Sequence, residues 1–175
     1  SDFVAMQGDH MILCIPQNGT NIFLECTSQD SPFGYQGTFT DDRDVLVVKS
    51  DGGEIIRTKI YEDKDNTQIS HGSYVISPTG DFSGKISILS SGTQYNKKSQ
   101  IPSVLPHQKE SYYKEYWDNI NNLKIEKMDF VNDKEKIQFT EELALSANNY
   151  GVVTNGKIFF VVNAFNHTSG NVKRI

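Results

Sequence analysis

The sequence has few cysteines, no long apolar run and no concentration of positive charge. Only two of its 175 residues are cysteine, Cys14 and Cys26, and this number does not settle the redox compartment. No apolar stretch approaches the roughly 20 residues that a membrane-spanning helix needs, so we expect no membrane span. The net charge is −5, with Lys and Arg scattered along the chain, which argues against a nucleic-acid-binding surface.

Hydrophobic residues make up 37% of the chain, which is enough for a modest core in one ordinary domain or in two small ones. The chain begins with Ser1 rather than methionine, close to the first predicted strand. We therefore expect it to be a piece of a longer protein.

Residues 8–27, GDHMILCIPQNGTNIFLECT, predict a β-hairpin. Asn18-Gly19 is the strongest short hairpin signal, because a type I′ turn needs positive φ at both central residues. Apolar runs flank this dipeptide on both sides. With the turn placed there, the register pairs Cys14 with Phe23.

Alternation along the two strands divides the hairpin into two faces. The first face carries His10, Ile12, Cys14, Phe23 and Glu25. The second face carries Met11, Leu13, Ile15, Ile22, Leu24 and Cys26. Because the second face is more uniformly apolar, we expect it to face the core. The two cysteines lie on opposite faces, which argues against a disulfide within the hairpin, and we expect both to be small buried hydrophobes.

The first face brings together the residues that predict chemistry. Glu25 is a diagonal cross-strand neighbour of His10, roughly 7–8 Å away at the backbone, so its carboxylate can take a hydrogen bond from the imidazole. A histidine oriented by a carboxylate is two thirds of a catalytic triad. The alternative is a solvated surface pair, the usual fate of such residues. Cys14 lies about 13 Å along the strand from His10, which makes it a poor nucleophile.

The next stretch, residues 28–39, has the composition of a loop rich in Gly, Pro, Ser and aromatic residues. Its aromatic side chains, Phe33, Tyr35 and Phe39, either line a groove or pin the loop to the body, and pinning is the more common role. The acidic residues that follow the loop, at positions 41, 42 and 44, lack the ligand spacing of a calcium loop and read as turn and capping residues. The sequence predicts no metal site and no cofactor.

The rest of the chain predicts a mainly β fold of the α+β class, with antiparallel sheets and one main helix. The helix is expected over residues 106–120, with Tyr113, Trp117 and Ile120 in one stripe directed at the core. A polar segment at 61–72, containing a surface histidine, His71, divides two predicted units, 1–60 and 61–175. Strands are predicted at 45–48, 54–60, 73–77, 85–90, 124–131, 137–145, 148–153 and 156–162, with a loop at 92–100, an irregular lead-in at 1–7 and a polar tail from His167 onward.

Three runs in the first unit, GDHMILCIP, FLECTSQDSPFGYQGTFTDDRDVLVV and GGEIIRTKIY, carry a family resemblance. They resemble the end of the catalytic core in bacterial transglutaminase-like proteins of the papain-like cysteine protease superfamily. In that family a nucleophilic cysteine at a helix start is followed by a histidine strand and then by an acidic strand. The resemblance implies that His10 takes the catalytic histidine position. It implies that Glu25 takes the position usually held by Asp.

The later part of the chain, from SGTQYNKK to GVVTNGKIFFVVNAFNH, resembles the β-rich accessory domain that follows the core in one secreted or periplasmic subgroup. The family's nucleophilic cysteine and oxyanion-hole residue are expected upstream of the histidine strand, where residues 1–7 carry no cysteine. The resemblance therefore implies a fragment that holds the histidine and the acid without the nucleophile.

We interpret the chain as a fragment of a transglutaminase-like cysteine protease or acyltransferase that is inactive alone. Its partners would be a peptide or protein substrate, reached through the parent protein, and either the missing N-terminal part or another chain. A catalytic core that has lost activity even in the full protein is a further possibility. The alternative function is a non-enzymatic β-rich binding or structural module of the cell envelope. That module would be marked by an exposed aromatic groove of Phe33, Tyr35 and Phe39.

Overall fold

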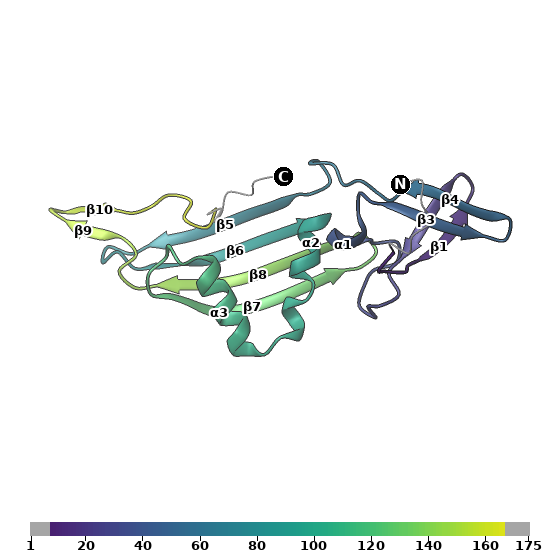
Figure 1. Cartoon of the computed structure of the whole chain (residues 1–175). Coiled ribbons are helices and arrows are strands. Elements are labelled where there is room, and N and C mark those ends of the chain that lie inside the picture. Colours follow the sequence, from purple (N-terminus) through teal and green to yellow (C-terminus); the bar gives the residue numbers. More distant parts are fainter. Residues whose placement is uncertain (1–7, 167–175) are drawn as a thin grey trace.

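A computed structural model describes residues 8–166, which form antiparallel sheets with few helices, so the predicted mainly β fold is confirmed. The lead-in at 1–7 and the tail at 167–175 lie outside the described residues. Figure 1 shows an elongated molecule, with two small hairpins at one end and a four-stranded sheet making up most of the other.

The first hairpin has the turn that the sequence predicts, and the second begins its return strand at Gly52, two residues before the predicted strand at 54–60. In the first, β1 (Leu13–Gln17) pairs with β2 (Thr20–Leu24) and Cys14 faces Phe23. Its turn residues Asn18 and Gly19 have φ of 36° and 90°, both positive as a type I′ turn requires. In the second hairpin, β3 (Asp44–Lys49) pairs with β4 (Gly52–Arg57).

The predicted core face of the first hairpin is wrong. Met11 and Leu13 on that face are 88% and 51% exposed, whereas Phe23 on the opposite face is 7% exposed. The physical reason is that the following chain folds back over the first face. A short helix, α1 (Gly37–Thr40), brings the ring of Phe39 edge-on against His10.

The cysteines of this hairpin only partly match expectation. Both are free thiols, in line with their positions on opposite faces. Cys14 is half-buried. Cys26 is exposed and was wrongly expected to be buried, because the face that carries it is the one left open.

The four-stranded sheet has the order β5-β6-β8-β7 and every pairing in it is antiparallel. Its strands are β5 (Gln68–Ile76), β6 (Phe82–Ser91), β7 (Leu123–Asp133) and β8 (Gln138–Ala147). β5 begins inside the segment predicted as a connection, because His, Gly and Ser interrupt its apolar alternation. His71 is exposed as expected, but it lies within this strand.

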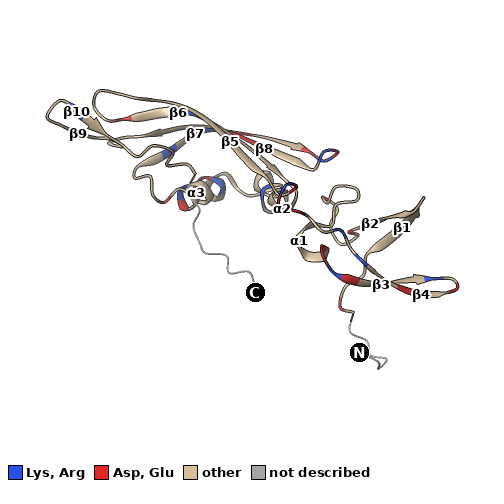
Figure 2. Cartoon of the chain, turned by 90° about the horizontal axis from the view of Figure 1, so that it is seen from above, with Lys and Arg blue, Asp and Glu red and all other residues tan. Residues whose placement is uncertain are grey.

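The helices cover one face of the sheet, as the two views in Figures 1 and 2 agree. The main helix, α3 (Pro106–Tyr116), begins with its proline in the first turn as predicted. A second helix, α2 (Thr93–Lys98), replaces most of the loop predicted at 92–100, and a 3-10 turn, η1 (Ile101–Ser103), follows it. That prediction is wrong because tertiary contacts of α2 outweigh its polar composition.

The main core lies between α3 and the inner face of the sheet. The predicted stripe is buried, with Tyr113 and Trp117 at 0% exposure and Ile120 at 4%, but α3 ends at Tyr116, so the helix is shorter than the predicted 106–120 and Trp117 and Ile120 follow it. The sheet contributes a row of large apolar side chains, namely Phe82, Ile86, Ile88, Leu143 and Leu145. A third hairpin, β9 (Val152–Thr154) and β10 (Lys157–Phe159), projects beyond the sheet in Figure 1 and is shorter than the strands predicted there.

An ion pair is buried between α2 and β8. Lys98 Nζ lies 3.1 Å from Oε1 of Glu141, which also accepts a hydrogen bond from the Tyr113 hydroxyl at 2.6 Å. The Lys98 side chain is 8% exposed and that of Glu141 is 0% exposed. Burial works to lower the pKa of Lys98, but the Glu141 carboxylate outweighs it and holds the pKa above its usual value.

Tyr35 joins the hairpin end of the molecule to the sheet end. Its ring is 3% exposed and packs edge-on against Tyr95, and its hydroxyl donates to the Gly92 carbonyl at 3.1 Å. The ring enters a second small core that includes Phe139. The division into units 1–60 and 61–175 stays a prediction, and this tyrosine is a buried link between them.

We expect Glu141→Leu to lower the free energy of unfolding by about 3–5 kcal/mol, because it leaves the Lys98 ammonium buried without a counter-charge. The double variant Lys98→Met/Glu141→Leu should recover most of the loss. Urea unfolding followed by circular dichroism measures both. Lys127→Met serves as a control, because its partner Asp129 is exposed and little change is expected. Equal losses in the single and double variants would contradict the role given to the ion pair.

Candidate functional site

The structure brings the two predicted site residues into contact. Nε2 of His10 lies 2.7 Å from Oε2 of Glu25, and their side chains are 23% and 13% exposed. Both residues sit just outside the paired part of the hairpin, His10 before β1 and Glu25 directly after β2. The hydrogen bond predicted from the register is therefore present. The catalytic role of the pair stays a prediction.

Glu25 is held on its second oxygen by Thr27. The Thr27 amide donates to Oε1 at 2.9 Å and its hydroxyl donates to the same atom at 2.6 Å. Burial works to raise the pKa of the Glu25 carboxyl, but these hydrogen bonds and the one to His10 outweigh it, so the pKa lies below its usual value. The carboxylate is thus kept charged and fixed in orientation.

The arrangement assigns different tasks to the two imidazole nitrogens of His10. Because the charged Glu25 carboxylate is an acceptor only, it favours the proton on Nε2. Nδ1 is then left with its lone pair, the form in which an imidazole can accept a proton. A histidine prepared in this way can act as a general base.

Phe39 covers one side of the imidazole. The ring centroids of His10 and Phe39 are 5.0 Å apart and the planes meet at 87°. The helix that carries Phe39 is anchored by Thr58, which is 3% exposed and donates its hydroxyl to the Thr40 carbonyl at 2.7 Å. The residue that follows β4 thereby positions the helix whose Phe39 packs on His10.

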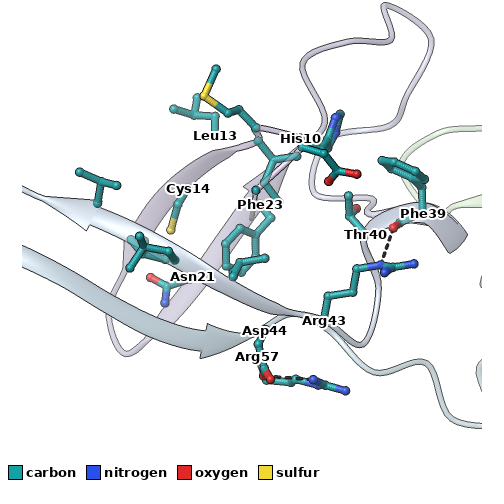
Figure 3. Close-up of a pocket in the computed structure, with 18 of the residues that line it drawn as sticks. His10, Leu13, Cys14, Asn21, Phe23, Phe39, Thr40, Arg43, Asp44 and Arg57 are labelled. Atoms are coloured by element: carbon teal, nitrogen blue, oxygen red, sulfur yellow. Dashed lines mark hydrogen bonds and ion pairs between the residues drawn. The ribbon is translucent and has the colours of Figure 1, made fainter. Parts of the chain in front are cut away.

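A groove of about 1160 Å³ runs from His10 between the two hairpins (Figure 3). Its walls include Leu13, Cys14 and Pro16 of β1 and every residue of β3. Arg43 also lines the groove and donates from Nε to the Phe39 carbonyl at 2.7 Å. This groove is where a reacting group could approach His10.

The cysteines of the chain do not complete a catalytic set with His10. Cys14 lines the same groove, but it is four residues further along the chain, on β1. Figure 3 shows it beside Asn21, away from the imidazole. Cys26 is exposed on the other face of the hairpin.

The aromatic groove that would mark a binding module is not formed. Tyr35 is 3% exposed because it pins the loop to the sheet end. Phe33 and Phe39 remain 69% and 61% exposed, but without Tyr35 they do not make the expected three-residue surface. The interpretation of the loop as pinned is confirmed for Tyr35, whereas Phe33 is exposed and Phe39 packs against His10 while most of its ring stays exposed.

The acidic residues after α1 act as ion-pair partners. Arg57 lies 2.9 Å from Asp42 and 3.0 Å from Asp44, across the start of the second hairpin. Among residues 8–166, no group of three or more His, Cys, Asp or Glu side chains could hold a metal ion. Within the same range no helix is long and apolar enough to cross a membrane.

Comparisons with family models, with curated proteins and with solved structures find no match to this chain. The interpretation of the site depends on its geometry. Two contributors to that geometry, Thr27 and Phe39, were missed as site residues in the sequence. The signal for Thr27 was its position two residues after Glu25, within reach of that carboxylate. The approach of Phe39 to His10 had no local signal.

The lowered pKa of Glu25 predicts a pH-dependent contribution to stability. A carboxyl group whose pKa is lower in the folded state stabilises the fold above its unfolded pKa, and this contribution is lost as the pH falls through the folded value. The unfolded pKa is near 4.5. We therefore expect Glu25→Gln to be less stable than the wild type at about pH 6, with the gap narrowing toward about pH 3.

Urea unfolding at several pH values measures this gap. Glu115→Gln is the matched control, since Glu115 is exposed on α3 and has no hydrogen bond or ion pair within residues 8–166. A gap for Glu25→Gln that stays constant across this pH range would contradict the assignment.

Proposed function

We propose that this chain is the part of a transglutaminase-like cysteine protease or acyltransferase that holds the catalytic histidine and its orienting carboxylate. His10 is the general base and Glu25 fixes its tautomer and direction. The observation that carries the proposal is the contact from Nε2 to a carboxylate whose other oxygen is already engaged by Thr27. That contact leaves Nδ1 as the basic atom.

The chemistry follows from which nitrogen is free. Nδ1 of His10 accepts the proton of a thiol, and the resulting thiolate attacks the carbonyl carbon of an amide. The imidazolium then gives its proton to the leaving amine, and an acyl-thioester remains. Water completes the reaction in a protease, whereas a second amine completes it in a transglutaminase. Glu25 stabilises the imidazolium that forms between these steps.

The thiol has to come from another polypeptide segment, since neither Cys14 nor Cys26 is in position. Exposed apolar side chains around the groove support the proposal that another polypeptide segment binds there. Met11 and Leu13 on the first hairpin are 88% and 51% exposed, and Val48 on the second is 81% exposed. Exposed apolar residues gathered at one site are typical of a surface that another polypeptide covers.

The family resemblance extends the proposal to the surroundings of the protein. A secreted or periplasmic location and a peptide or protein substrate would follow from membership of that group. The departure from the group's usual aspartate lengthens the acidic side chain by one methylene. Thr27, which donates twice to Oε1 of Glu25, supports that longer side chain.

An activity assay compares turnover by this chain alone with turnover by the longer polypeptide that supplies the thiol. The chain alone should give no turnover of a fluorogenic peptide and no incorporation of a labelled amine. In the longer polypeptide that supplies the thiol, we expect His10→Ala to lower kcat by about 10²–10⁴-fold with KM little changed. Glu25→Gln should lower kcat by a smaller factor, because the base remains but is oriented less strictly.

His71→Ala provides the matched control, because His71 is exposed on β5, outside the groove. It should leave kcat unchanged. Turnover by the isolated chain that disappears in His10→Ala would contradict the claim that the nucleophile lies elsewhere. A longer polypeptide that loses no activity in His10→Ala would overturn the role of the histidine.

A further inference from the structure

Among residues 8–166, the outer edge of β5 is unpaired. Within that range β5 pairs only with β6, and eight of its nine residues, from Gln68 to Val75, are exposed. One side of an edge strand presents backbone N–H and C=O groups that no strand of the sheet pairs. The sequence of β5, QISHGSYVI, contains no lysine, arginine, aspartate, glutamate or proline. These are the residues that usually prevent an edge from pairing with another chain.

The opposite edge of the same sheet has those protective features. β7 has an irregularity in its pairing between Ile125 and Lys127, where the strand is bulged. It also carries charged side chains at Lys124, Glu126, Lys127 and Asp129. The contrast between the two edges indicates that β5 is not merely a terminal strand. It is the edge that the sequence leaves available for pairing.

The side-chain pattern of β5 is self-complementary. If two copies pair in antiparallel fashion about Gly72, Ile69 of each copy lies opposite Val75 of the other. Both side chains are on the outer face of the sheet, at 47% and 70% exposure. An apolar cross-strand pair of this kind stabilises a sheet. The pairing repeats on both sides of the symmetry axis, which is the geometry of a two-fold dimer.

Among residues 8–166, no strand lies beside the outer edge of β5, and the ring of Phe165 packs against Tyr74 on its inner face. The helices α2 and α3 pack on β6, β7 and β8 rather than on β5, as Figure 1 shows. β5 carries no lysine, arginine, aspartate or glutamate. Pairing two copies of this strand therefore creates no like-charge repulsion between them, although each chain has a net charge of −5. A strand with apolar side chains and no charge fits a second copy of itself better than a charged partner.

We propose that β5 is a self-association surface, through which two copies of this chain pair antiparallel about Gly72 and form one continuous eight-stranded sheet. The contact is one strand wide, so the dimer is weak and depends on concentration. This proposal does not depend on the function proposed for His10 and Glu25.

Charge substitution tests both the surface and the register. Analytical ultracentrifugation of the chain over a range of concentrations should show a monomer–dimer equilibrium. In the double variant Ile69→Lys/Val75→Lys, each new lysine faces another lysine across the symmetry axis. Two like-charge pairs should raise the dimer dissociation constant by at least about tenfold. Ile69→Glu/Val75→Glu should weaken the homodimer in the same way.

Mixing the two variants provides the rescue. A lysine double variant and a glutamate double variant place opposite charges at both contacts, so the mixture should form a heterodimer although neither variant dimerises well alone. Recovery in the mixture also shows that both variants are folded. Val131→Lys is the matched control, because Val131 is exposed on the outer face of the other edge strand at 59% and should leave dimerisation unchanged.

Three results would overturn the proposal. The first is a wild-type chain that remains monomeric at all accessible concentrations. The second is a dimer that Val131→Lys disrupts and the lysine double variant does not. The third is a mixture of the two folded double variants that stays monomeric, which would reject the register about Gly72.

Discussion

A two-residue turn determines where the proposed site can form. The positive φ angles of Asn18 and Gly19 close the first hairpin in a register that pairs Cys14 with Phe23. Extended beyond the paired residues, away from the turn, the same register places His10 and Glu25 on one face of the hairpin. There Nε2 of His10 lies 2.7 Å from Oε2 of Glu25. A shift of one residue would turn one of these side chains to the opposite face. The contact depends on the turn first, and on the local hydrogen bonds of Thr27 second.

The parts of the structure that could be predicted from the sequence are those with local causes. The Asn-Gly turn set the hairpin register, Pro106 marked the start of α3, and the stripe containing Trp117 identified the buried side of that helix. The core face of the first hairpin could not be predicted in this way. Which face is covered depends on where residues 28–40 fold back, and Phe39 approaches His10 from that later segment.

The helix α2 shows the same limit at the sheet end. Its sequence, TQYNKK, has no apolar periodicity, and its contacts come from residues far along the chain. Lys98 meets Glu141 on β8, and Tyr95 packs against Tyr35 from the loop after the first hairpin. Two further surfaces stay open among residues 8–166. One is the groove beside His10, and the other is the unprotected edge of β5.

The function proposed here requires a thiol beside Nδ1 of His10 in the complete protein. Treating that protein with 1,3-dibromoacetone, which bridges a thiol to an adjacent imidazole, and mapping the cross-linked peptides by mass spectrometry tests this requirement directly. The predicted result is a single cross-link that joins His10 to a cysteine other than Cys14 and Cys26. A cross-link from that cysteine to a different histidine, or none to His10 in the folded protein, would contradict the proposed role of the hairpin.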